Sequence, residues 1–151
     1  MDSLNINSII KHFHDLTSDF VLRQSDIICI NETFLKANQK PPPLPKYRCF
    51  AASKGRAAGV AIYIHRKFKV VSPAQVWAED TYQAVKLQLD KFDIISIYRS
   101  PKVKLQESFI DFVKNIIHIN RPTIVCGDMN INFLENPNNL FTSTMSLLGF
   151  V

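Results

Sequence analysis

Short apolar runs of strand length dominate the sequence and limit the folds that are open to it. Three of them lie at residues 26–30, 92–98 and 123–127, and each is rich in isoleucine or valine. Runs of this length and content are typical of strands that are buried on both faces of a sheet. We therefore predict a sheet whose strands are covered from both sides.

Further strands are predicted between the first two of these runs. Two of them lie within residues 47–71, around a turn at 53–56, and two more lie near 70–77 and 82–89. In the last of these, apolar side chains alternate with polar ones such as Lys86. This alternation is typical of a sheet with one face in water.

Three segments have the periodicity of helices. Residues 8–22 and 105–118 carry apolar side chains at three- and four-residue spacing, and a last helix is predicted from residue 138 or 139 to 148. Strands joined by short turns and interrupted by two long helices predict an α/β fold. We expect a four-layer sandwich, in which two mixed β-sheets pack face to face with the helices outside.

Composition narrows the class of protein and of partner. The net charge of +5 and the pI of about 9.2 favour an anionic partner such as nucleic acid, although a basic surface also serves solubility alone. The three cysteines form no Cys-x-x-Cys pair, which predicts a reduced, intracellular protein without a zinc site. No run approaches the roughly 20 apolar residues of a membrane span, so we expect no membrane partner. The length of 151 residues predicts a single domain, 1–151.

Polar residues at the ends of the predicted strands are the candidates for chemistry. Glu32 follows the first run, Tyr98 ends the second, and Asp128 and Asn130 follow the third. Carboxylates can hold Mg²⁺, which takes one or two of them together with water and substrate phosphate. The amide and the phenol can donate hydrogen bonds to a charged phosphate. Each of them also has a plainer interpretation, since Asp-x-Asn after Gly127 is common in simple Asx turns.

Basic residues could supply contacts to the substrate. Lys54 and Arg56 lie in a predicted turn, and Arg99 follows Tyr98. Contacts of this kind to phosphates hold DNA without reading its sequence. A solvated basic face is the alternative interpretation of the same residues.

The order of these residues resembles the endonuclease/exonuclease/phosphatase superfamily, which contains deoxyribonucleases and apurinic/apyrimidinic endonucleases. The segments that carry the resemblance cover essentially the whole chain: Leu4-Asn5-Ile6-Asn7-Ser8, Ile30-Asn31-Glu32-Thr33, Ala58-Gly59-Val60-Ala61-Ile62-Tyr63, Ile97-Tyr98-Arg99-Ser100-Pro101 and Gly127-Asp128-Met129-Asn130. The resemblance implies catalytic roles for Asn5, Glu32, Tyr98, Asp128 and Asn130. It implies metal contacts by Asn5, Glu32 and Asp128, with Asn7 as second choice for Asn5, and Mg²⁺ or else Mn²⁺ as the cofactor.

The segments around His12 and Ser25 look most like the endonuclease domains of mobile elements, namely LINE-type retrotransposons and Helitrons. The resemblance therefore implies an endonuclease that hydrolyses DNA phosphodiester bonds through contacts to the phosphate backbone. We expect an intracellular protein located in the nucleus. The family's closing Asp-His pair, whose His is the acid/base, is not found in the sequence. We accordingly expect a domain that lacks the start of the first strand and the C-terminal strands. An inactive remnant is the first alternative, and a phosphatase of the same fold that acts on phosphoinositides or lipid headgroups is the second.

Overall fold

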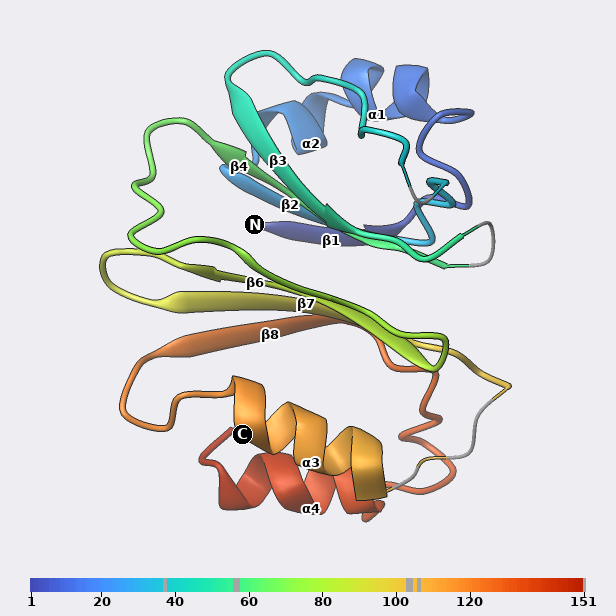
Figure 1. Ribbon diagram of the computed structural model, residues 1–151, viewed down its shortest axis with the longest axis vertical. Helices are drawn as coiled ribbons and strands as arrows, with labels where there is room; N and C mark the ends of the chain where they lie inside the picture. Colours follow the sequence, from blue (N-terminus) through green and yellow to red (C-terminus); the bar gives the residue numbers. More distant parts are fainter. Residues whose placement is uncertain (37, 56–57, 103–104, 106, 151) are drawn as a thin grey trace.

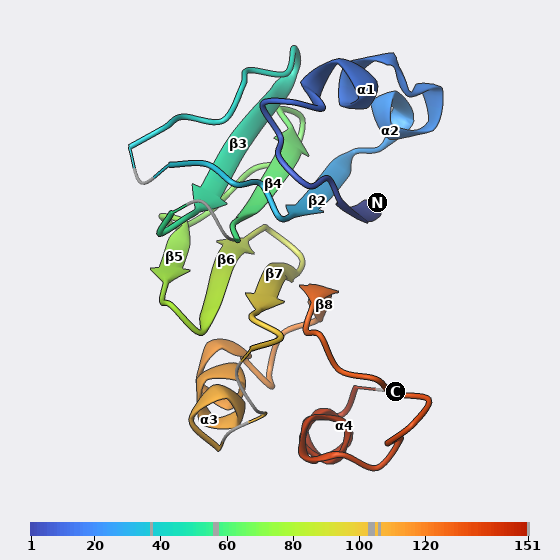
Figure 2. The same ribbon diagram turned by 90° about the vertical axis from the view of Figure 1, so that its right-hand side faces the viewer.

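The computed structural model has four layers, in which two β-sheets pack face to face and helices cover the two outer faces (Figures 1 and 2). It describes residues 1–36, 38–55, 58–102, 105 and 107–150. The predicted α/β sandwich with two mixed sheets is thereby confirmed. No helix in the described part of the chain is both long enough and apolar enough to cross a membrane.

The first sheet has the strand order β1-β2-β4-β3. Its strands are β1 (Asp2–Asn5), β2 (Ile27–Asn31), β3 (Tyr47–Ala52) and β4 (Val60–His65). β1 and β2 are parallel, whereas β4 is antiparallel to both of its neighbours. All five residues of β2 are buried, as its apolar run predicts.

The second sheet repeats this plan with the strand order β5-β6-β7-β8. Its strands are β5 (Gln75–Ala78), β6 (Tyr82–Gln88), β7 (Asp93–Arg99) and β8 (Thr123–Asp128). β7 and β8 are parallel and the other pairs are antiparallel. β8, predicted to be fully buried, is instead only partly covered, because it lies at the edge of the sheet and pairs with β7 alone.

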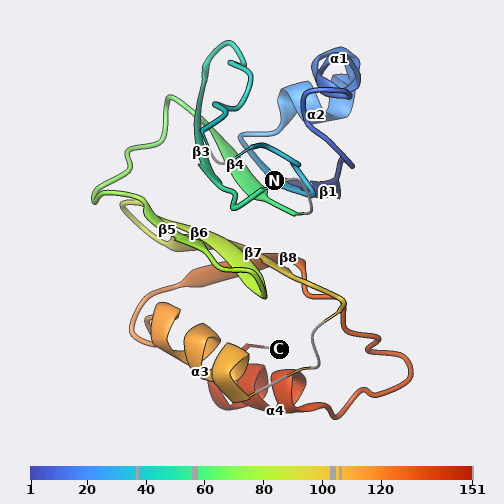
Figure 3. The ribbon, with the colours of Figure 1, turned by 45° about the vertical axis from the view of Figure 1, so that its right-hand side comes forward.

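Three apolar layers hold the sandwich together. The central layer joins the two sheets and includes Ile62, Val85 and Tyr98. Another packs the first sheet against α1 (Phe13–Ser18) and the segments around it, and the third packs the second sheet against α3 (Glu107–Ile116) and α4 (Leu140–Leu147). Figure 3 shows α3 and α4 on the outer face of the second sheet.

The prediction of a single helix over residues 8–22 is wrong. The structure divides this segment into α1 and α2 (Phe20–Gln24), with Asp19 in extended conformation between them. The Asp19 carboxylate accepts a hydrogen bond from the backbone N–H of Leu22, at 2.9 Å, and so caps the second helix. Phe20, which belonged to the predicted apolar stripe, is 73% exposed as a consequence.

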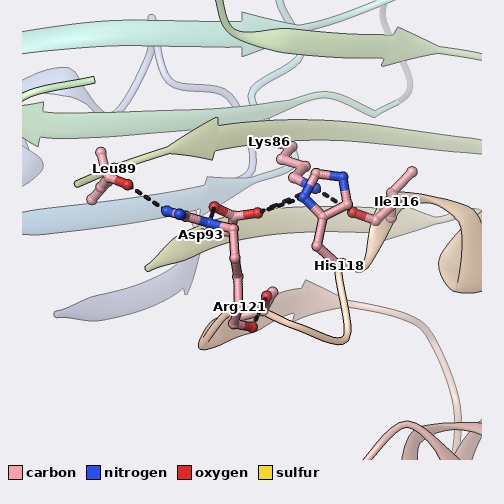
Figure 4. A network of polar contacts seen from close by, with 7 residues as sticks. Lys86, Leu89, Asp93, Ile116, His118 and Arg121 are labelled. Atoms are coloured by element: carbon pink, nitrogen blue, oxygen red, sulfur yellow. Dashed lines mark hydrogen bonds and ion pairs between the residues drawn. The ribbon is translucent and has the colours of Figure 1, made fainter. Parts of the chain in front are cut away.

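The face of β6 that carries Lys86 was predicted to meet water, and this is also wrong. Helix α3 covers that face, and Lys86 is only 2% exposed. Its ammonium donates to the carbonyl of Ile116 and lies 3.3 Å from Oδ2 of Asp93, a carboxylate with no exposed surface (Figure 4). Arg121 pairs with the same carboxylate, and the imidazole of His118 lies 3.3 Å from its Oδ2, so three side chains surround Asp93.

The thiol of Cys49 gives the fold a pH-dependent stability at alkaline pH. Burial raises the pKa of Cys49 from 9.0 to about 12, although a hydrogen bond with Tyr63 opposes this rise. The thiol ionises in the unfolded chain before it does so in the folded one, so its contribution is intact below pH 9 and is lost as the pH rises towards 12. We expect Cys49→Ala to flatten the decline in unfolding free energy, measured by urea titration between about pH 8 and about pH 11. Equal slopes for the two proteins would contradict this attribution.

Candidate active site

The predicted site residues meet at one end of the sandwich, the right-hand end in Figure 1, where β1, β7 and β8 finish. In the first sheet Asn5 is the register partner of Asn31, the residue before Glu32. In the second sheet Tyr98 is the register partner of Asp128. Parallel strands finish together, so each pair stands at the carboxyl edge of its own sheet.

Strand alternation turns these pairs towards one another. Cys29 and Cys126 lie in the layer between the sheets, and each is two residues before Asn31 or Asp128. Side chains two residues apart on a strand share a face. Asn5 and Asn31 therefore face the second sheet, and Tyr98 and Asp128 face the first.

The phenol of Tyr98 is influenced by acidic residues of both sheets. Burial raises the pKa of Tyr98, and the negative charges of Glu32 and Asp128 raise it further. A carboxylate from each sheet therefore acts on one phenol that is itself only 6% exposed. The catalytic and metal-binding roles of Glu32, Tyr98 and Asp128 stay a prediction.

The turn that carries Glu32 is held from both sides. Glu32 has a φ of 54°, a left-handed conformation that costs a non-glycine residue about 1–2 kcal/mol. Its carbonyl accepts from the N–H of Ser8 at 2.8 Å, and the N–H of Thr33 donates to the carbonyl of Gly59 at 3.2 Å. A Cβ at Gly59 would overlap the Thr33 hydroxyl, so only glycine lets the strands approach this closely.

A second tight turn presents Asp128 and Asn130. Gly127 has a φ of 132°, and a Cβ there would overlap the carbonyl of Ile97, which explains the glycine before Asp128. Oδ1 of Asp128 accepts from the N–H of Asn130 at 3.0 Å, so the segment also forms the Asx turn of the plainer interpretation. The amide of Asn130 donates to the carbonyl of Arg99 at 2.7 Å, while its side chain remains on the surface.

Arg99 is buried rather than presented to a substrate. It is 6% exposed, and its guanidinium donates to the carbonyls of Met129 and Asn130, both at 2.7 Å. Burial lowers the pKa of Arg99, and the nearby Asp128 opposes this shift. Its phosphate-binding role predicted from sequence conflicts with this placement, because the side chain is turned inwards to hold the Asp128–Asn130 turn.

Of the two other basic residues, Lys54 lies on the surface at the connection between β3 and β4. Its ammonium is 3.1 Å from Asp80, in an ion pair that is exposed on both sides. Register places this connection at the same end as Glu32, since Val60 at the start of β4 pairs with both Asn31 and Ala52. Arg56 lies outside the described residues.

Two buried amide side chains, those of Asn31 and Gln83, also lie at the site. Asn31 belongs to the segment Ile30-Asn31-Glu32-Thr33, whereas Gln83 was not predicted from the sequence. Oδ1 of Asn31 and Oε1 of Gln83 are both buried and have no hydrogen-bond partner among the described atoms. Gln83 is the register partner of Tyr98, on the strand face that also carries Val85. The alternation of β6 could have revealed Gln83, because it shares its face with the apolar Val85 and Leu87.

The residues at this edge suit a hard cation. Two carboxylates, an amide at Asn5 and the unpartnered oxygen of Asn31 supply the oxygen ligands that Mg²⁺ and Mn²⁺ prefer. Among the described residues no three His, Cys, Asp or Glu side chains gather into a metal cluster. A cation here would therefore keep water or phosphate as its remaining ligands, as Mg²⁺ commonly does.

The histidines lie elsewhere. His118 is beside Asp93, at the other end of β7. His65 ends β4 at the opposite end of the first sheet from Glu32, and His12 and His14 belong to the helical layer. The described residues thus bring no imidazole to the edge formed by Glu32 and Asp128.

Comparison with known proteins gives a consistent assignment. A profile of the Endonuclease/Exonuclease/phosphatase family matches residues 3–149. The chain is 28% identical over 141 residues to recombination repair protein 1 of Drosophila melanogaster, a match that covers 78% of this chain and 20% of that protein. It therefore spans about a fifth of this curated relative.

Solved structures share the fold. The endonuclease domain of TRAS1, a telomere-specific non-LTR retrotransposon, superposes with a TM-score of 0.67 at 17% identity, over 97% of this chain and 70% of that one. An AP endonuclease from Archaeoglobus fulgidus superposes with a TM-score of 0.62 at 20% identity, over 85% of this chain and 56% of that one. The Neisseria 3′ phosphatase NExo, bound to a product DNA hairpin, superposes with a TM-score of 0.66 at 15% identity, over 97% of this chain and 69% of that one.

Proposed function

Because the chain belongs to the endonuclease/exonuclease/phosphatase family, we propose that it is a DNA endonuclease that hydrolyses phosphodiester bonds with the help of Mg²⁺. The observation that carries this proposal is the convergence of Glu32 and Asp128, one from each sheet, on the buried phenol of Tyr98. Carboxylate oxygens are the ligands that Mg²⁺ prefers, so a carboxylate from each sheet suits a shared divalent ion. Mn²⁺ offers the same preference for oxygen ligands and is the alternative cofactor.

We assign each residue a part in holding the cation or the phosphate. Glu32, Asp128 and Asn5 would hold the cation, which when bound polarises a phosphoryl oxygen and lowers the pKa of water. Tyr98 keeps its proton to high pH, because burial and the two carboxylates raise its pKa, so its hydroxyl remains a donor to phosphate. Asn130 has a second amide hydrogen beyond the one that Arg99 accepts, and we propose that it donates to the same group.

The mobile-element type of endonuclease is the finer part of the proposal. Its support is the likeness to the TRAS1 endonuclease domain, which extends over 97% of this chain, together with the net charge of +5, which suits a DNA backbone. A DNA substrate would also agree with the nuclear location that we expect from the sequence.

The substrate can be tested directly with three classes of phosphate ester. We expect the protein to nick supercoiled plasmid in Mg²⁺ and to stop in EDTA, with little release of phosphate from a phosphoinositide. A 3′-phosphorylated oligonucleotide is the informative third substrate, because the similar NExo structure is that of a 3′ phosphatase. Preference for the phosphoinositide would overturn the proposal, and no turnover of any substrate would favour the inactive alternative.

The rate of nicking should be low. A positioned acid/base group contributes about 10²–10⁴-fold to such a reaction. The histidines of this chain lie away from the site. We therefore expect that the nicking assay will need long incubation and a high protein concentration.

A further inference from the structure

A second basic surface lies at the opposite end of the first sheet from the candidate active site. We define it as the distal groove, a depression of about 380 Å³ lined by Arg48, Arg66, Lys67, Phe68, Lys69 and Val70. Tyr47 pairs with His65, and Ile27 pairs with Ile64, so this end adjoins the start of β2, whereas Glu32 follows its end. In Figure 1 the segment after β4 lies on the left and the ends of β7 and β8 on the right.

The charge of the distal groove is strongly one-sided. It contains four cationic side chains, and the backbone of Lys46 adjoins it, because the Lys46 carbonyl accepts from the N–H of Arg66 at 2.8 Å. Among the described residues, the ion pair found for these cations joins Lys67 to Asp26. Arg66 and Lys69 are exposed at the rim of the groove.

The groove is also built rather than merely basic. Arg48 is partly buried, and its guanidinium donates to the carbonyl of Phe68 at 2.6 Å, which fixes the chain after β4. Nε of the same guanidinium is buried and has no hydrogen-bond partner among the described atoms. The groove therefore has a fixed floor at Arg48, and it offers the exposed cations of Arg66, Lys67 and Lys69 to an anion.

The aromatic ring in the groove argues against recognition of bases. Phe68 packs against the apolar layer between the sheets, and the ammonium of Lys67 lies 5.5 Å from its ring centroid. A ring that packs against the core and lies near an ammonium is a poor platform for stacking of bases. The chemistry that remains is contact with phosphates, which does not depend on sequence.

We propose that the distal groove binds the phosphate backbone of a second nucleic-acid segment, apart from the segment at the active site. The two surfaces lie at opposite ends of a five-residue strand, β2, which sets a span of about 17 Å. Such a surface would hold a target on the protein without entering the hydrolytic site. This inference goes beyond the proposed hydrolysis and does not depend on it.

The test is the salt dependence of binding, measured by fluorescence anisotropy in EDTA so that no hydrolysis occurs. Labelled duplex DNA, single-stranded DNA and RNA are used as separate probes. Each phosphate contact contributes a slope of about 0.9 for duplex DNA, or about 0.7 for single strands, to log K against log salt. We expect the Arg66→Gln/Lys69→Gln double variant to lose about 1.8 of slope for duplex, or about 1.4 for single strands. The probe that loses this slope identifies the nucleic acid.

The matched control is Lys11→Gln/Lys114→Gln, which removes the same charge from two exposed lysines outside the groove. We expect this control to keep nearly the full slope. Equal losses in the two double variants would overturn the proposal, because net charge alone would then explain them. Binding of acidic phospholipid vesicles that depends on Arg66 and Lys69, without such dependence for nucleic acid, would overturn it as well.

A second measurement avoids substitutions altogether. Lysine acetylation of the unmodified protein, mapped by mass spectrometry, should be slowed at Lys69 when the oligonucleotide is bound. Acetylation of Lys114 on α3 serves as the internal reference. An unchanged rate at Lys69 under saturating oligonucleotide would contradict the proposal, whatever the behaviour of the variants.

Discussion

Replacing Asp128 with asparagine, or Glu32 with glutamine, should lower the rate of plasmid nicking at least about hundredfold, since losing one group that stabilises the transition state typically costs 10²–10³-fold. Both substitutions keep the size of the side chain and remove its charge. Burial and these two charges together raise the pKa of Tyr98, which indicates that they act on one small volume. The rate of appearance of relaxed plasmid is the measurement.

The matched control for this prediction is Asp111→Asn. Asp111 is an exposed acid on α3, 3.7 Å from Lys114, and belongs to the outer helical layer. The Asp111→Asn variant should nick plasmid at the wild-type rate. A variant of Glu32 or Asp128 that is folded by circular dichroism and nicks as fast as the wild type would remove these residues from the mechanism.

Replacing Asp93 with alanine should destabilise the fold by about 3–5 kcal/mol, because it leaves buried positive charge without its partner. Oδ1 of Asp93 accepts from Nε of Arg121 at 3.0 Å, while Oδ2 lies 3.3 Å from both Lys86 and His118 without hydrogen-bond geometry (Figure 4). Lys86, 2% exposed, would keep only the carbonyl of Ile116. Urea unfolding at neutral pH measures the loss.

The Lys86→Met/Asp93→Ala double variant distinguishes loss of a partner from loss of packing. An apolar side chain at position 86 needs no counter-charge, so the double variant should be more stable than Asp93→Ala alone. A cost below about 1 kcal/mol for Asp93→Ala would mean that the network behaves like a surface ion pair. That outcome would contradict the buried character of Asp93 and Lys86.

The strands and turns that are determined by residues close together in the sequence could be predicted from it. The run at 26–30 corresponds to the buried strand β2. Glu32, Tyr98 and Asp128 lie at the ends of β2, β7 and β8, respectively. Glycine was informative at position 127, because only glycine fits against the carbonyl of Ile97. These features follow from strand length, β-branched content and backbone sterics, which act over a few residues.

The features that depend on distant parts of the chain were not predictable in this way. Lys86 lies on a face that would meet water if α3 did not cover it. Arg99 turns inwards because the chain 30 residues later offers two carbonyls to its guanidinium. Gln83 enters the site only through its pairing with Tyr98. In each case, tertiary contacts override the local pattern.

We propose that Glu32 and Asp128, which come from two different sheets, form one site for a divalent cation. Binding of Mn²⁺ measured by electron paramagnetic resonance tests it most directly, because free and bound ions give separable signals whether or not catalysis occurs. We predict one Mn²⁺ site in the wild-type protein, displaced by Mg²⁺ and lost in both Glu32→Gln and Asp128→Asn, with Asp111→Asn unchanged. Binding of Mn²⁺ that persists equally in both site variants would contradict a shared cation site at Glu32 and Asp128.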